Sequence, residues 1–420
     1  MLLNPMTEGG CRRERASEQL NLGGALMRTR PLVSITSFVL ILSAPLFAGS
    51  HPINVDCDRG ESLARAIELA SVLAHTPGSK RSDRLEFHIS GTCREHVRIE
   101  SDRVTLRGIG DAAIIGPFQE ACISTIPPLK FLYNCYGAIE VTGARDVRIE
   151  NLSISEDVPE GVLATFGAGV MGREASIRIT GCRITNTRVG VAGSHLNVEV
   201  VDTEIDLDNI PGFFDNNFAF FAAESRISVQ GGSLAGGLVK WVLNKGTKLD
   251  IRDTQISGEP DAPFQQAIFV SNGRSDMTLT GTIHDVAQSS FSLVDNSTLR
   301  FGRNVVLDRT DGVNSLIRAN KFSYVDVSGL LRFKGSVTAT NFSRVLLGND
   351  HSPLSVSCDA SSDVFGESAS GGPSPMPSVP LCDDRGALSV TQDGFVELLP
   401  RGLATATSSS GDSEMNRNGE

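Results

Sequence analysis

Three segments of the chain concentrate acidic residues that could hold a cation or transfer a proton. They are residues 155–166, 206–216 and 257–266. The acidic members are Glu156, Asp157, Glu160, Asp206, Asp208, Asp215, Glu259 and Asp261. Clustered carboxylates can bind Ca²⁺ or perform acid–base chemistry. Acids on the loops of an acidic protein can equally be solvated surface groups without a ligand.

The middle segment carries the most varied set of candidate ligand groups. Asp206 and Asp208 share one parity, which places both carboxylates on one side of a strand and makes them the candidate Ca²⁺ ligands. Phe213 and Phe214 could stack on sugar rings, or they could pin the loop to the body. We expect two basic residues to lie near the same groove. They are Arg188 and Lys240.

A repeat determines which elements must position these residues. Its copies read apolar-x-apolar-x, then Gly, Asn or Asp, then two residues and often an apolar one, as in IRITGCRI at Ile177 and VEVVDTEI at Val198. From Val147 to Val325 the copies begin 21 to 30 residues apart. Repeats of this length are typical of solenoids.

Two columns of the repeat indicate how the chain turns. Gly, Asn or Asp falls where a sharp bend needs a positive φ, at Asn151, Gly181, Asp202, Gly231, Asp253, Gly281 and Gly329. The next residue is small or apolar, as an inward stack requires. A further apolar strand precedes each copy, which gives three strands per coil. We therefore predict an all-β, right-handed parallel β-helix, with the three acidic segments projecting from alternate coils ~10 Å apart.

The ends of such a solenoid need caps. Residues 58–74 carry Leu63, Ala66, Ile67, Ala70 and Leu73 at helical spacing, which predicts an N-terminal capping helix. We expect the β-helix with this cap to span residues 51–358. A C-terminal capping loop and last strand would then occupy residues 359–403, and a disordered tail residues 404–420.

The N-terminus predicts export. Residues 27–50 have a basic start, an apolar stretch and small residues for cleavage, the order of a signal peptide. Residues 1–26 are polar, which indicates an upstream extension from a misassigned start. Without residues 1–50, which hold five basic and three acidic residues, the net charge is −13. That charge excludes nucleic acid as a partner and disfavours polyanionic sugars unless a divalent cation or a local basic patch bridges them. We expect a secreted or periplasmic protein that leaves the membrane after signal removal.

Seven cysteines follow residue 50, and an oxidising compartment lets them pair. Cys57 and Cys93 flank the predicted helix. Two further pairs are close in sequence and bracket irregular segments. They are Cys122 with Cys135 and Cys358 with Cys382. Cys182 has no predicted partner and falls in the column of inward residues that follows the bend, so we predict a free, buried thiol.

The stretches VDCDRGESLARAIELA and FHISGTCREHVRIESDRVTLRGIG resemble the N-terminal cap and first coils of pectin-lyase-like right-handed parallel β-helix proteins. The resemblance covers residues 51–358. It implies the fold and leaves the activity open, because this superfamily includes polysaccharide lyases, hydrolases, epimerases, tailspikes and adhesins. The Gly-His-Gly and Arg-Ile-Lys of its polygalacturonase-like branch and the Asp-Pro-His-Asp of its epimerase-like modules are not in this sequence.

Two interpretations of the function follow. The first is a protein that binds, and possibly processes, extracellular or envelope polysaccharide in the groove beside the acidic loops, with Ca²⁺ as a possible ligand. The alternative is a non-catalytic extracellular solenoid with a structural or adhesin-like role. The apolar outer face of the strand that precedes each repeat favours the alternative, and the loop acids favour the first.

Overall fold

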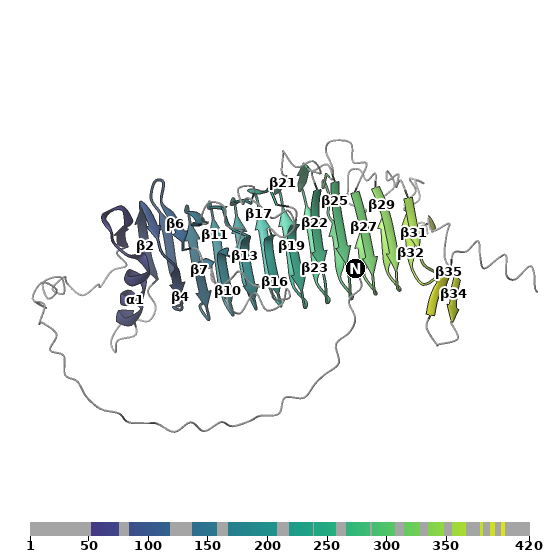
Figure 1. Ribbon diagram of the computed structural model, residues 1–420, viewed down its shortest axis with the longest axis horizontal. Helices are drawn as coiled ribbons and strands as arrows, with labels where there is room; N and C mark the ends of the chain where they lie inside the picture. The colour runs from purple at the N-terminus through teal and green to yellow at the C-terminus, as the bar shows by residue number, and fades with distance from the viewer. Residues whose placement is uncertain are drawn as a thin grey trace, which may run out of the picture. The chain divides into compact units, whose positions relative to one another are not determined.

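The computed structural model describes residues 52–74, 84–117, 137–157, 167–207, 218–237, 239–257, 266–285, 288–306, 315–327, 335–347, 355–366, 379–380, 387–390 and 396–399. Within these ranges the chain forms three long sheets, with the strands stacked in sequence order from the N-terminal to the C-terminal coil (Figure 1). Each complete coil contributes one strand to each sheet, which we call sheets A, B and C in chain order.

Sheet A contains the repeat strands. They are β1(Ile53–Asp56), β2(Leu85–Ser90), β5(Val104–Gly108), β8(Val147–Glu150), β11(Ser176–Thr180), β14(Asn197–Val201), β17(Arg226–Gln230), β20(Lys248–Arg252), β23(Asp276–Thr280), β26(Thr298–Phe301), β28(Tyr324–Asp326), β30(Arg344–Leu347), β32(Asp363–Gly366) and β33(Val379–Pro380).

Sheet B contains the shortest strands. They are β3(Thr92–Arg94), β6(Ala113–Gly116), β9(Ser153–Glu156), β12(Arg183–Thr185), β15(Glu204–Asp206), β18(Ser233–Ala235), β21(Gln255–Ser257) and β24(Ile283–Asp285).

Sheet C contains the apolar strands that precede the repeats. They are β4(Val97–Ile99), β7(Gly137–Thr142), β10(Ala168–Arg173), β13(Val189–Ser194), β16(Phe218–Ala223), β19(Val239–Asn244), β22(Gln266–Ser271), β25(Gln288–Leu293), β27(Ser315–Asn320), β29(Gly335–Thr340) and β31(Ser355–Cys358).

The described strand pairs of sheets B and C are all parallel, and sheet A is parallel up to its last strand. In the described part of the chain β33 pairs antiparallel with β32, and a separate hairpin joins β34(Ala387–Val390) to β35(Val396–Leu399). The parallel pairing of β30 with β32 extends past the boundary expected at residue 358. The predicted fold class, an all-β parallel β-helix with an N-terminal helix, is confirmed.

The bend between sheets A and B follows the predicted chemistry. All six described members of the Gly, Asn and Asp column have a positive φ, from 46° at Asp202 to 69° at Gly231. The inward residues that follow them are nearly all buried, including Leu152, Thr203 and Thr254. Gly329 lies outside the described residues. The column is readable in the sequence because few residue types tolerate the left-handed conformation.

The core is one continuous stack inside the coils. Neighbouring sheet C strands place Phe220, Trp241, Phe269 and Phe291 in consecutive register positions. The Phe269 and Phe291 rings stack with centroids 4.3 Å apart, and such aromatic contacts add about 0.5–1.5 kcal/mol beyond area burial.

The helix α1(Leu63–Ala74) covers the N-terminal end of this core, as predicted. Leu63, Ile67 and Ala70 are buried against it, and both Ser62 Oγ and the Leu63 amide donate to Glu95. The expectation that Leu73 shares the buried face is wrong, since its side chain is 58% exposed. At 3.6 residues per turn Leu73 lies about 80° around the axis from Leu63.

Candidate functional site

Glu156 is the most strongly perturbed carboxyl among the described residues. Glu156 lies two residues after the buried Ile154 on β9, so its side chain points to the same, inner side of the strand. In the strand register that runs from β9 through β12 to β15, its position corresponds to that of Leu207, which is buried two coils later. Burial raises the pKa of the Glu156 carboxyl to about 8. Glu156 therefore faces the interior, whereas we expected it to project with the other loop acids. A carboxyl that keeps its proton at neutral pH can act as a general acid or can be a buried structural group.

Arg188 lies at the corner between sheets B and C on the following coil. Its amide donates to the Gly167 carbonyl, its carbonyl accepts from Phe218, and only 5% of the residue is exposed. Burial lowers the pKa of its guanidinium. The preceding Thr187 is fully buried, and its hydroxyl has no hydrogen-bond partner in the described structure.

Lys240 is fully buried, with Nζ donating to the Gly236 carbonyl. On β19 Lys240 lies opposite Ala219 of β16, between the register pairs Phe218–Val239 and Phe220–Trp241. Ala219 belongs to the interior core, so Lys240 also points inward. We had expected Lys240 to lie near the groove beside the acidic loops. In the structure its ammonium is buried, so a ligand on the outer surface does not contact it.

The predicted acidic groove is only partly described. Asp206 ends β15, and Arg183 approaches both Glu204, at 3.3 Å, and Asp206, at 3.4 Å. Glu204 and Asp206 lie on the outer side of β15, on either side of the buried Ile205. The other predicted ligands lie outside the described residues. They are Asp208, Phe213, Phe214, Asp215, Glu259 and Asp261. The ligand site and its Ca²⁺ stay a prediction.

The outer face of sheet C is apolar in its central coils. Met171, Ala192 and Phe221 occupy one register row and form a second buried cluster with Ala168 and Val189. The same row begins at Arg98 and Glu140. His96 lies 3.5 Å from Glu140, and this contact lowers the pKa of the Glu140 carboxyl against the effect of burial. The expected apolar outer face is confirmed for β10, β13 and β16, whereas later in the same row Ser292 and Arg318 are polar.

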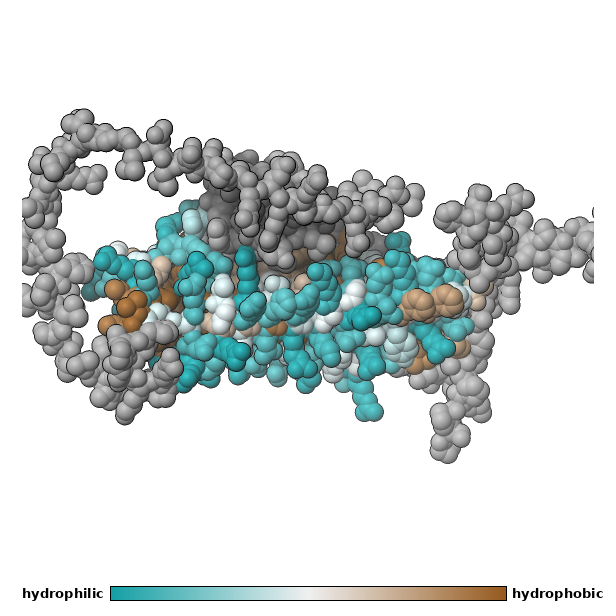
Figure 2. All heavy atoms as spheres, turned by 90° about the horizontal axis from the view of Figure 1, so that it is seen from below, coloured by the Kyte–Doolittle hydropathy of each residue, from teal (hydrophilic) through white to brown (hydrophobic). Residues whose placement is uncertain are grey.

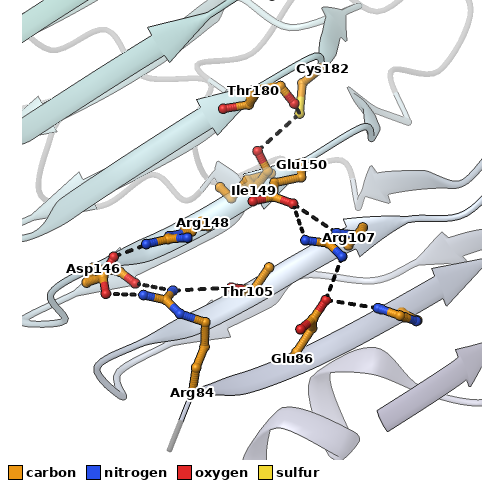
Figure 3. A network of polar contacts seen from close by, with 11 residues as sticks. Arg84, Glu86, Thr105, Arg107, Asp146, Arg148, Ile149, Glu150, Thr180 and Cys182 are labelled. Atoms are coloured by element: carbon orange, nitrogen blue, oxygen red, sulfur yellow. Dashed lines mark hydrogen bonds and ion pairs between the residues drawn. The ribbon is translucent and has the colours of Figure 1, made fainter. Parts of the chain in front are cut away.

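The outer face of sheet A carries charge ladders that run from coil to coil. Arg107 bridges Glu86, at 2.8 Å, and Glu150, at 2.9 Å, and Arg84 reaches Asp146 two strands away (Figure 3). Exposed pairs of this kind contribute about 0–1 kcal/mol each. Their regular pairing indicates a solvated structural face.

One exposed aromatic pair stands out on the C-terminal coils. Phe322 and Phe342 stack with ring centroids 5.2 Å apart and an interplanar angle of 6°. They are 60% and 61% exposed, and their φ angles are 61° and 62°. Gly246, Arg274 and Asn296 take the equivalent corner position in earlier coils. The face in Figure 2 is mainly hydrophilic, with hydrophobic groups near both ends of the coil stack.

A second inward column, which was not predicted from the sequence, lies at the corner from sheet C to sheet A. Its members are Ser225, Thr247, Ser275, Ser297, Ser323, Ser343 and Ser362. Most of these hydroxyls donate to a carbonyl two or three residues earlier, as Ser275 does to Asn272 at 2.7 Å. The usable signal is a Ser or Thr just before each repeat from Ser225 onward.

The cysteines follow the predicted scheme where they are described. Cys57 and Cys93 form a disulfide, and Cys182 is free and buried, with its pKa raised to about 11 by burial. Cys358 is disulfide-bonded, while Cys122, Cys135 and Cys382 lie outside the described residues. Cys57, Cys93 and Glu95 form a close group, but the disulfide removes the thiolates that a metal would need.

Comparison with known proteins adds a distant likeness in structure. No family model matches the sequence, and no curated protein matches it. The structure is similar to that of PfbA, a surface adhesin of Streptococcus pneumoniae, with 10% sequence identity and a TM-score of 0.36. The match covers 82% of this chain and 99% of that chain. At this TM-score the likeness carries no argument about function, and membership of the pectin-lyase-like superfamily stays a prediction.

Proposed function

We propose that the protein is a non-catalytic, adhesin-like solenoid of the extracellular space that holds its partner through the Phe322–Phe342 pair. The observation that carries this proposal is the exposure of two stacked aromatic rings on left-handed backbone. The left-handed conformation costs a bulky residue about 1–3 kcal/mol of folding free energy. Ring stacking stabilises the pair by about 0.5–1.5 kcal/mol, so these two residues contribute little to the stability of the fold.

The surroundings of the pair have the composition of a binding surface. Lys321 lies 3.3 Å from Asp295, and Asn341 Nδ2 donates to Asn320 Oδ1 at 2.7 Å. These polar groups flank the rings as the polar rim of an interface flanks its apolar centre. Aromatic residues are also enriched among those that dominate binding energy.

The extracellular location is part of the proposal. The Cys57–Cys93 disulfide is of a kind that forms and persists in oxidising compartments, and residues 27–50 read as a signal peptide. None of the described helices is long and apolar enough to cross a membrane.

The test compares the wild-type chain, residues 51–420, with Phe322→Asn/Phe342→Asn on immobilised neutral glycans and on intact cells. Asn tolerates the left-handed conformation, so the backbone is retained while the rings are removed. Loss of binding with an unchanged melting temperature supports the proposal. Equal binding by both chains contradicts it.

A second candidate function is the binding and processing of polysaccharide at the corner between sheets B and C. The raised pKa of Glu156 favours it, because such a carboxyl can donate a proton to a leaving group at neutral pH. Product release from uronate and neutral glycans, measured with and without Ca²⁺, tests this candidate. Turnover that Glu156→Gln abolishes would support it, and an absence of turnover on the whole panel would exclude it.

A further inference from the structure

A groove of about 870 Å³ lies at the corner where sheet C ends and sheet A begins, on the central coils. It crosses five consecutive coils and is open to solvent. The charged side chains that line it are Arg145, Glu174, His195, Glu224, Arg226, Lys245 and Lys248. Ala175 and Leu196 form part of the floor, with Ser176 and Asn197 beside them. The groove is therefore long, shallow and polar at its walls.

The groove has a charge opposite to that of the whole chain, which carries −11. Four of its side chains are permanently basic and two are acidic. Glu224 is already engaged, with His195 Nε2 at 2.5 Å and Lys245 Nζ at 3.9 Å. Arg145, Arg226 and Lys248 are exposed and have no ion pair in the described structure.

The placement of two of these cations is unfavourable for the fold. Arg226 and Lys248 begin β17 and β20 and are directly opposite each other in the parallel register. Like charges at such positions destabilise a sheet, and neighbouring strands are only about 4.8 Å apart. On the same sheet Arg178 is paired with Glu199 at 3.5 Å on one side and is opposite Arg148 on the other, and Lys248 is opposite Asp276 on β23. Among the described residues neither Arg226 nor Lys248 forms an ion pair, so both charges are available to an anionic ligand that spans the two strands.

We propose that this groove binds an anionic glycan chain through its carboxylate or sulfate groups. One anionic group lies between Arg226 and Lys248, and a second lies at Arg145. A guanidinium matches the planar pair of oxygens of such groups, and an ammonium adds a point charge beside it. Sugar hydroxyls between the anionic groups face Asn197, Ser176 and His195.

The groove fits a glycan better than a nucleic acid. Nucleic-acid binding needs a dense run of cations to replace the counterions of closely spaced phosphates. Here three unpaired cations span several coils of an otherwise acidic protein. A glycan with anionic groups separated by neutral hydroxyls matches both the sparse charge and the polar walls. The cations belong to the protein, so binding needs no Ca²⁺, unlike binding at the predicted acidic loops.

The experiment is isothermal titration calorimetry of the chain 51–420 with three oligosaccharides of equal length, one of uronates, one sulfated and one neutral. EDTA is present throughout. The variant Arg226→Gln/Lys248→Gln removes the opposed cations. The matched control Arg59→Gln/Arg183→Gln removes the same charge from exposed residues outside the groove.

The proposal predicts that at least one anionic oligosaccharide binds and that binding weakens as salt is added. The groove variant should bind about tenfold more weakly, which is about 1.4 kcal/mol, while the control keeps its affinity. The anionic probe that binds more tightly identifies carboxylate or sulfate as the preferred group. Failure of both anionic probes to bind, equal binding of the neutral probe, an unchanged affinity in the groove variant, or an equal loss in the control would each overturn it.

The groove and the aromatic pair are tested separately. Phe322→Asn/Phe342→Asn should keep its affinity for the anionic oligosaccharide, because its substitutions lie on later coils. Melting curves of the groove variant should match or exceed those of the wild type, since the substitutions relieve a like-charge contact. Failure of the groove proposal therefore leaves the proposed adhesive role standing, and the reverse also holds.

Discussion

The carboxylate of Glu156 occupies the space where a side chain at Gly167 would lie. A Cβ added to Gly167 would be 1.5 Å from Glu156 Oε1. Gly167 directly precedes β10, so the interior carboxyl of one coil is enclosed by the backbone that begins the next strand of sheet C. This contact explains why the carboxyl is removed from water and why its pKa rises.

Replacing Glu156 by Gln should stabilise the protein above pH 8. The folded carboxyl keeps its proton up to about pH 8, whereas the unfolded one releases it near ~4.3. The contribution to stability is therefore fully present below the unfolded pKa, falls as the pH rises through this window, and is lost above pH 8. The cost there is on the order of 5 kcal/mol.

Thermal melts between pH 4 and pH 9 measure this effect. Glu156→Gln should flatten the fall in melting temperature, and Asp157→Asn, at the exposed neighbouring carboxyl, should leave the slope unchanged. The same slope in wild type and Glu156→Gln would show that the buried carboxyl does not control it.

Removing the aromatic pair should not weaken the fold. Phe322→Asn/Phe342→Asn replaces two residues that resist a positive φ by one that tolerates it, and the rings bury little surface. We expect a melting temperature equal to or above that of the wild type. A loss above about 2 kcal/mol would show that the pair is structural, since ring stacking alone supplies about 0.5–1.5 kcal/mol.

Cys182 should be the one reactive thiol of the exported chain, and only after unfolding. Its sulfur is buried, with the Ile149 and Thr180 carbonyls 3.5 Å away, and the raised pKa keeps it protonated. Alkylation followed by intact-mass measurement should label no thiol in the native chain 51–420 and one in denaturant. Labelling of two or more thiols in the native state would contradict the disulfide scheme.

The Cys57–Cys93 disulfide should stabilise the N-terminal cap. Cys57→Ser, Cys93→Ser and the double variant should each lose about 2–4 kcal/mol of unfolding free energy. Because either single substitution breaks the bond, the double variant should lose little more than one single variant. Additive losses in denaturant titrations would show that the two residues act independently.

The predicted Ca²⁺ site has its own test. Replacing Asp206, Asp208 and Asp215 together by Asn should abolish any Ca²⁺ binding seen by calorimetry, with thermal stability nearly unchanged. The control replaces Glu199, Asp250 and Asp326 on sheet A by their amides. Unchanged Ca²⁺ binding in the Asp206 variant would place the cation elsewhere.

The sequence was sufficient for the coils because their bends select few residue types. Asn151, Gly181 and Asp202 mark the bend from sheet A to sheet B, and the inward neighbours Leu152 and Thr203 follow from it. Periodicity of this kind is set by backbone sterics, which act in every coil alike.

The features that matter for function were harder to predict. Phe322 and Phe342 occupy a left-handed position where Gly or Asn is normal, so no rule of turn chemistry points to them. Ser297 and Ser323 read as turn residues, yet they are buried because a nearby carbonyl accepts each hydroxyl proton. Lys240 was expected outside because a charge is rarely placed inward, whereas in the structure its ammonium is buried and donates to the Gly236 carbonyl.

Binding and turnover measured together on one panel test the central claim most directly. The chain 51–420 is screened against uronate, sulfated and neutral glycans and against intact cells, with and without Ca²⁺, alongside Phe322→Asn/Phe342→Asn. A non-catalytic adhesin-like solenoid predicts binding without product formation, and it predicts that binding to neutral glycans and to cells weakens when the two rings are removed. Product formation by the wild-type chain, or unchanged binding to neutral glycans and cells without Phe322 and Phe342, would contradict it.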